Sequence, residues 1–115
     1  MTTITAPTET TTVATAAAAA IDDKKGLDIV LLDVSRLLVI TDVFVIATGT
    51  SNRHVGTLIG EVEEQLRERL DRRPLRREGL EDRRWVLLDY GDVLVHVFHA
   101  DERAYYRLER LYGDV

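Results

Sequence analysis

Residues 85–99, WVLLDYGDVLVHVFH, indicate the fold most directly. Two apolar runs, 84–90 and 93–98, flank the pair Gly91-Asp92. A glycine-containing pair between two runs of β-forming residues is typical of a tight antiparallel hairpin. The sequence therefore predicts a hairpin here, and with it an antiparallel part of a sheet.

Alternate residues of the first hairpin strand should point to opposite faces of the sheet. One set is Trp85, Leu87 and Asp89, and the other is Val86, Leu88 and Tyr90. If the second set faces the core, the first presents an aromatic, an aliphatic and a carboxylate side chain to solvent. That composition is typical of a protein–protein contact. The alternative is that Trp85, the single tryptophan of the chain, simply covers the core.

The remaining segments predict the other elements of the fold. Runs rich in β-branched residues at 28–34 and 42–48 predict two strands that are covered on both faces. Apolar residues spaced 3, 1, 3, 4 and 4 apart predict a helix from about Asn52 to Arg69; they are Val55, Leu58, Ile59, Val62, Leu66 and Leu70.

Three further elements complete the expected order. An alanine-rich helix is expected over 13–25, and a short edge strand over 75–78. A last helix should begin at Ala100 or Asp101 and end at Gly113, with Tyr105, Leu108, Leu111 and Tyr112 on one face. The resulting order, α-β-β-α-β-β-β-α including the short edge strand, predicts an α+β (mixed α/β) fold with a single sheet packed by helices.

The chain of 115 residues is long enough for one domain with one core. Residues 1–12, rich in Thr and Ala, are expected to form a flexible tail, and residues 13–115 the folded domain. The chain has no cysteine, which excludes disulfides and thiolate sites. No stretch approaches the roughly 18 to 20 apolar residues of a transmembrane helix, and no signal-peptide pattern is present. We therefore expect a cytoplasmic protein without membrane contact.

The charge of the chain bears on its partners. The net charge of −5 disfavours binding to nucleic-acid phosphates and favours a basic partner protein. Segment 67–84 reverses this balance, with eight arginines against five acidic residues. It could contact RNA, but we prefer a solvated, salt-bridged connector because the acids dilute the arginines and Trp85 is the only aromatic residue beside them.

Sites for catalysis or metal binding are not indicated by the sequence. His96 and His99 have opposite parity on their strand, and no Asp-x-Asp pair occurs. We therefore expect no catalytic residue, no metal and no cofactor. The backbone N–H groups after Gly49 open a helix and could bind an anion, which leaves a nucleotide-binding domain or an enzyme as the alternative.

Five strings resemble the ribosomal silencing factor S, or Iojap-like, family over about residues 13–114. They are KKGLDIVLLDV (24–34), ITDVFVIATGTSNRHV (40–55), PLRREG (74–79), WVLLDYGDVLVHVFH (85–99) and YYRLERLYGD (105–114). The resemblance implies a non-enzymatic translation repressor that binds ribosomal protein fourteen of the large subunit and sterically blocks subunit joining under nutrient limitation. It also implies a homodimer, and a fold similar to nucleotidyltransferases without their active-site acids.

The resemblance also implies the residues that bind the partner. The positions that match the family's binding motif are Trp85, Leu88, Asp89, Tyr90 and Asp92, to which we add Arg76, Arg77 and Glu78. The strand alternation places Leu88 and Tyr90 opposite to Trp85. A bulge, a curled edge or a site at the tip of the hairpin would be needed to bring all of them to one surface.

Overall fold

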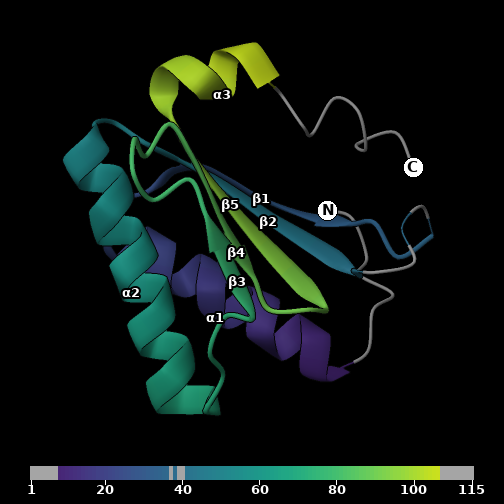
Figure 1. Cartoon of the computed structure of the whole chain (residues 1–115). Coiled ribbons are helices and arrows are strands. Elements are labelled where there is room, and N and C mark those ends of the chain that lie inside the picture. The colour runs from purple at the N-terminus through teal and green to yellow at the C-terminus, as the bar shows by residue number, and fades with distance from the viewer. Residues whose placement is uncertain (1–7, 37, 39–40, 107–115) are drawn as a thin grey trace.

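The computed structural model describes residues 8–36, 38 and 41–106, which form one sheet and three helices (Figure 1). The strands are β1 (Leu27–Asp33), β2 (Val43–Gly49), β3 (Arg76–Glu78), β4 (Trp85–Asp89) and β5 (Val93–His99). The helices are α1 (Thr8–Asp23), α2 (Asn52–Leu70) and α3 (Ala100–Tyr106). The predicted element order and the α+β class with a single sheet are confirmed.

The five strands are arranged in the order β1-β2-β5-β4-β3. The central pair, β2 and β5, is parallel and runs in register from Val43 opposite Val93 to Gly49 opposite His99. The other neighbours are antiparallel. The β4–β5 hairpin is closed by the Tyr90 N–H, which donates to the Val93 carbonyl over 2.9 Å, and Gly91 adopts a φ of 89° in the turn. Such a left-handed φ favours glycine, so the turn forms where the sequence predicts it.

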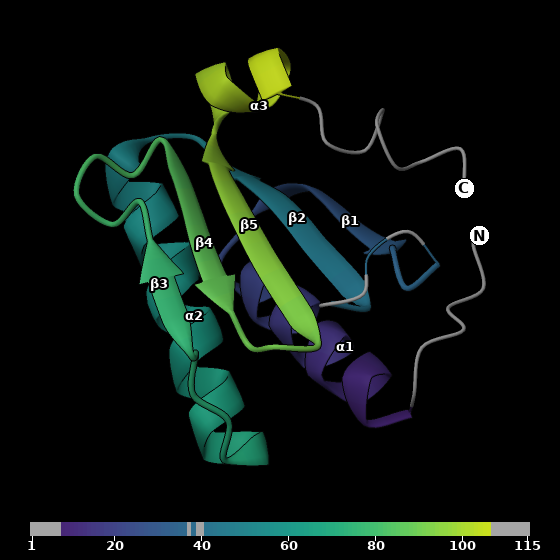
Figure 2. The ribbon, with the colours of Figure 1, turned by 45° about the vertical axis from the view of Figure 1, so that its right-hand side comes forward.

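Both long helices pack on the same face of the sheet. Figure 2 shows α1 and α2 behind the strands. The apolar stripe of α2 that the spacing predicts is buried from Val55 to Leu66, and all seven residues of β2 are buried. This layer of helices against a sheet is the main hydrophobic core, and it includes Val13 and Ile21 of α1 and Val86, Leu88 and Tyr90 of the hairpin.

The face of the sheet turned away from α1 and α2, called the open face below, carries a second apolar cluster. Val34, Phe44, Ile46 and Phe98 are buried there, with Val30, Leu32, Leu38, Trp85 and Leu94 partly buried around them. Helix α3 lies at one end of the sheet (Figure 2). The Arg103 guanidinium fixes α3 there, donating to Thr48 Oγ1 over 2.9 Å and to the Asp28 carbonyl over 3.0 Å.

Helix α1 begins at Thr8, five residues before the start that the sequence predicts at about residue 13. The sequence suggested otherwise because threonine is a weak helix former. A tertiary contact supplies the missing stabilisation: Thr10 is only 3% exposed, and its hydroxyl donates to the Asp92 carboxylate over 2.8 Å. Residues 1–7 lie outside the described part of the chain, as do Leu108, Leu111, Tyr112 and Gly113 of the expected last helix.

Within the ranges that the structure describes, no helix combines the length and the apolar character needed to cross a membrane.

Candidate functional site

The open face brings together four of the predicted partner-binding residues. Trp85 and Asp89 alternate along β4 with buried neighbours, which confirms the predicted parity. Arg76 and Glu78 lie beside them on β3, where Arg76 is in register with Asp89 and Glu78 with Leu87. Leu87 lies between Trp85 and Asp89 and is half-buried, so it belongs to the same surface although the binding motif does not include it. The strand alternation in the sequence already placed Leu87 on the same face as Trp85 and Asp89.

Two predicted contact residues, Leu88 and Tyr90, lie instead in the main core. Leu88 is 0% exposed and Tyr90 is 2% exposed, both among residues packed against the helices. The β4–β5 register is continuous from Trp85 to Asp89, so the alternation is maintained along the strand and both side chains point away from the open face. Both side chains therefore support the strand from behind in this structure, and a direct contact with a partner stays a prediction. Burial also raises the pKa of the Tyr90 hydroxyl, which keeps it protonated.

Arg77 also points toward the helix side of the sheet. It lies opposite Leu88 in the β3–β4 register, and its guanidinium reaches Glu63 of α2 over 3.3 Å. It therefore lies at the rim of the helix layer, whereas Arg76, the preceding residue, lies on the open face.

Trp85 belongs to the second apolar cluster and is only partly buried there. Its ring stacks on Phe98 with the centroids 4.7 Å apart, and its Nε1–H donates to His96 Nδ1 over 3.1 Å. These contacts hold the indole in one orientation while part of it remains accessible. The two interpretations of the sequence are thus compatible: the inner side of Trp85 covers the core, and its outer side is available to a partner.

His96 is a neutral histidine buried beneath this surface. It is 6% exposed, and burial lowers its pKa to about 4. Because Nδ1 accepts the hydrogen bond from Trp85, the proton of the neutral ring is assigned to Nε2. Nε2 has no hydrogen-bond partner among the described residues. His96 thus positions the indole and must remain uncharged to do so.

This burial predicts a pH dependence of stability. Unfolding restores the ordinary pKa of about 6.5, so the unfolded chain takes up a proton between pH 6.5 and 4 that the folded protein excludes. The contribution of His96 to the free energy of unfolding is complete above pH 6.5 and is lost as the pH falls. The loss amounts to about 3 kcal/mol between pH 7 and 4. Urea titrations at several pH values would measure it. The variant His96→Phe should show a shallower loss, and equal slopes in the two proteins would contradict the assignment.

The Asp89 carboxylate is fully engaged within the chain. Its Oδ1 accepts from the Gly91 N–H over 2.8 Å. Its Oδ2 accepts from Arg76 through Nε and through the terminal nitrogen, each over 3.0 Å. The first bond belongs to the hairpin turn, and the second joins β3 to β4 across the open face.

Asp92 connects three elements at the hairpin turn. One carboxylate oxygen accepts from Thr10 of α1, and the other accepts from Arg72, in the connection after α2, over 2.9 Å. Its carbonyl accepts from the Asp42 N–H over 2.9 Å and from the Thr41 hydroxyl over 3.1 Å. Since both carboxylate oxygens have intramolecular partners, we interpret Asp92 first as a structural residue that holds α1 and β2 against the turn.

The arginine-rich segment is largely neutralised by ion pairs. Within the described part of the chain, six of its eight arginines have an acidic partner within 4 Å: Arg67 with Glu68, Arg72 with Asp92, Arg73 with Asp71, Arg76 with Asp89, Arg77 with Glu63 and Arg84 with Glu102. This agrees with the salt-bridged connector that we preferred over an RNA contact.

The junction after Gly49 forms an ordinary capped helix start. Ser51 Oγ accepts from the His54 N–H over 3.0 Å, and the Thr50 N–H donates to His54 Nδ1 over 2.9 Å. The other ring nitrogen of His54 is bonded to the Lys24 carbonyl over 2.9 Å. Two of the N–H groups at this helix start, those of Thr50 and His54, are therefore already used within the chain. No group of three or more metal-ligating side chains occurs among the residues that the structure describes.

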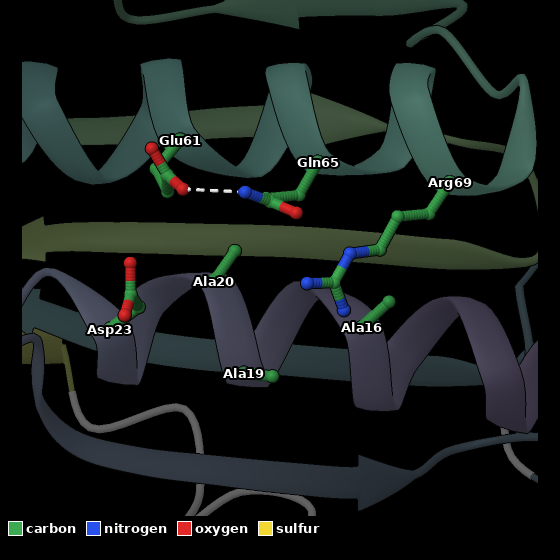
Figure 3. A pocket seen from close by; sticks show the side chains of 7 residues that line it. All are labelled: Ala16, Ala19, Ala20, Asp23, Glu61, Gln65 and Arg69. Atoms are coloured by element: carbon green, nitrogen blue, oxygen red, sulfur yellow. Dashed lines mark hydrogen bonds between the residues drawn. The ribbon is translucent and has the colours of Figure 1, made fainter.

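A groove of about 260 Å³ lies between α1 and α2 (Figure 3). It is lined by Ala16, Ala19, Ala20, Asp23, Glu61, Gln65 and Arg69. Glu61 is bonded to Gln65 over 2.8 Å along one wall. The groove belongs to the helix layer, whereas Trp85 and Asp89 lie on the other face of the sheet, so it is not part of the surface described above.

Comparisons with known proteins agree on one family. The model of the family described as "Ribosomal silencing factor during starvation" matches residues 7–115. A protein of Bacillus subtilis named "Ribosomal silencing factor RsfS" is 46% identical over 98 residues, which cover 85% of this chain and 82% of that protein. The maize "Protein Iojap, chloroplastic" is 33% identical over 97 residues, covering 84% of this chain and 42% of that protein.

A solved structure shows the same fold. A crystal structure of a protein from Chromobacterium violaceum superposes with a TM-score of 0.85 at 40% identity, covering 90% of this chain and 85% of the other.

Proposed function

Because this chain belongs to the family of ribosomal silencing factors, we propose that it represses translation by binding the large ribosomal subunit and blocking the joining of the small subunit. The proposed contact is a basic ribosomal protein, protein fourteen of the large subunit, as the resemblance implies. The proposed setting is nutrient limitation in the cytoplasm. Repression would then result from occupying a surface, with no chemical step.

The observation that carries this proposal is the surface formed by Trp85, Leu87 and Asp89 on the open face. A partly buried tryptophan that is already held in place by Phe98 and His96 loses little side-chain entropy on binding. Aromatic anchors of this kind dominate the energy of many protein–protein contacts. The surface therefore has the features of a preformed contact for another protein.

Charge supports a basic protein as the partner. The chain carries a net charge of −5, and its arginine-rich segment is mostly paired with acids, as described above. Opposite net charges speed association and set the orientation of the partners. Ribosomal RNA carries one negative charge per phosphate and would repel such a surface. This combination favours docking on an exposed protein patch of the ribosome over docking on its RNA.

The proposal can be tested by sedimentation. The chain should co-sediment with purified large subunits and should fail to do so with subunits depleted of protein fourteen. Added in excess before the small subunit, it should reduce the fraction of joined ribosomes in a sucrose gradient. Adding it after joining serves as the control, because a steric block requires access to the free subunit. Normal joining in the presence of bound protein would contradict the proposal.

The resemblance also implies a homodimer, which remains part of the proposal. The partly buried Trp85 and Leu94, on the open face, offer apolar area for self-association. Light scattering across a range of concentrations would measure the mass in solution.

A further inference from the structure

We propose that Arg76 is a placeholder for a basic side chain of the partner. In the free protein its guanidinium occupies the position on the Asp89 carboxylate that a lysine or arginine of the partner takes in the complex. This inference rests on the proposed function, and it makes Arg76 a residue that sets affinity and selects for cationic side chains.

The geometry of Asp89 is the first step of the argument. Its Oδ1 is fixed by the Gly91 N–H of the turn, so the carboxylate keeps its orientation whether or not Arg76 is present. Its Oδ2 faces Arg76 alone among the described residues and takes two N–H groups, each over 3.0 Å. A charged oxygen that accepts two donors from one guanidinium is a position suited to another cationic donor group.

The second step is that Arg76 can leave at little cost. Its side chain is 63% exposed, whereas that of Asp89 is 15% exposed. It projects from β3, an edge strand of three residues, all exposed. Ion pairs with so exposed a partner contribute little to stability, because water solvates the freed cation well. A partner that brings its own cation therefore exchanges one ion pair for another.

The third step is that an unmoved Arg76 opposes a basic partner. Arg76 lies on the open face beside Trp85 and Leu87, the surface on which the partner is proposed to dock. A like charge opposite the partner's cation is unfavourable at short range. Binding therefore requires Arg76 to turn away from Asp89, and the bound state must contain a cation that replaces it.

The adjacent arginine provides a matched control. Arg77 is also on β3, is half-exposed, and also pairs with one carboxylate, that of Glu63. It points to the helix side of the sheet, away from the open face. Arg76→Gln and Arg77→Gln thus remove the same charge from adjacent positions, and they change long-range electrostatic steering equally.

The experiment compares the affinities of wild type, Arg76→Gln and Arg77→Gln for purified large subunits at two salt concentrations. We expect Arg76→Gln to bind about 3- to 5-fold more tightly than Arg77→Gln, because the partner no longer has to displace an intramolecular cation. The difference in affinity between Arg76→Gln and Arg77→Gln should disappear when Asp89→Asn is added to both. A neutral amide then replaces the carboxylate for which Arg76 and the partner's cation compete. Thermal unfolding of each variant checks that the fold is unchanged.

If Arg76→Gln bound more weakly than Arg77→Gln, or equally tightly, the proposal that Arg76 is a placeholder would be overturned. The first result would mean that Arg76 contacts the partner directly, and the second that only net charge matters. In both cases the proposed function would still stand, because wild type binds. If wild type fails to bind the large subunit, the proposed function fails, and the placeholder fails with it.

Discussion

Replacing Trp85 by alanine should lower the affinity for the large ribosomal subunit by about 30- to 1,000-fold, which corresponds to about 2 to 4 kcal/mol. The truncation removes the exposed part of the indole, and it also frees Phe98 and His96 from the contacts that order this surface. The dissociation rate should change more than the association rate, because Trp85 carries no charge. Binding kinetics on immobilised subunits would measure both.

Two variants separate binding from stability in this test. Trp85→Phe keeps an aromatic ring near Phe98 but lacks the Nε1–H that His96 accepts, so its affinity should be intermediate. Val86→Ala changes the next residue, which is fully buried on the helix side. It should lower stability and leave the affinity of the folded protein unchanged. A folded Trp85→Ala protein that binds as tightly as wild type would contradict the site.

Replacing Leu88 by alanine should lower the free energy of unfolding by about 2 to 5 kcal/mol, the range for a large apolar side chain removed from a packed core. Leu88 is fully buried against the helix layer, so its loss leaves a cavity behind the strand. Domains of this size are stable by only about 5 to 15 kcal/mol, so the variant could lose a large fraction of its stability. Chemical denaturation would measure the change.

The same substitution tests whether Leu88 contacts the partner or only supports the strand. The folded fraction of Leu88→Ala should bind the large subunit with the affinity of wild type, once corrected for the unfolded fraction. Leu87→Ala is the matched control on the open face and should do the opposite, weakening binding with a smaller loss of stability. If Leu88→Ala weakened binding without destabilising the protein, Leu88 would be a contact residue after all.

The elements of the fold could be predicted because their apolar patterns extend over many residues and the hairpin turn contains a glycine. The stripe from Val55 to Leu66 and the Gly91-Asp92 turn both form where the pattern places them. The start of α1 could not be predicted, because it depends on a hydrogen bond between Thr10 and Asp92, which are far apart in the sequence. Local propensity contains no information about such a contact.

The candidate site was less predictable for a related reason. A family motif identifies residues that matter for binding, but it does not separate residues that contact the partner from residues that support the strand. Strand parity did separate them, since it placed Leu88 and Tyr90 opposite to Trp85, and the burial of both confirms that parity. Asp92 shows the limit of parity: it lies in the turn, where alternation ends, and its bonds to Thr10 and Arg72 follow from tertiary structure alone.

The parallel pairing of β2 with β5 has a consequence for how the chain acquires its structure during synthesis. Val43 pairs with Val93, so the centre of the sheet closes only after everything between them has been made. Closing so long a loop is slow, because chain entropy is lost before contacts compensate. A nascent chain that ends before β5 therefore lacks the strand that joins the two halves of the sheet. We expect the protein to mature after its last strand has left the exit tunnel.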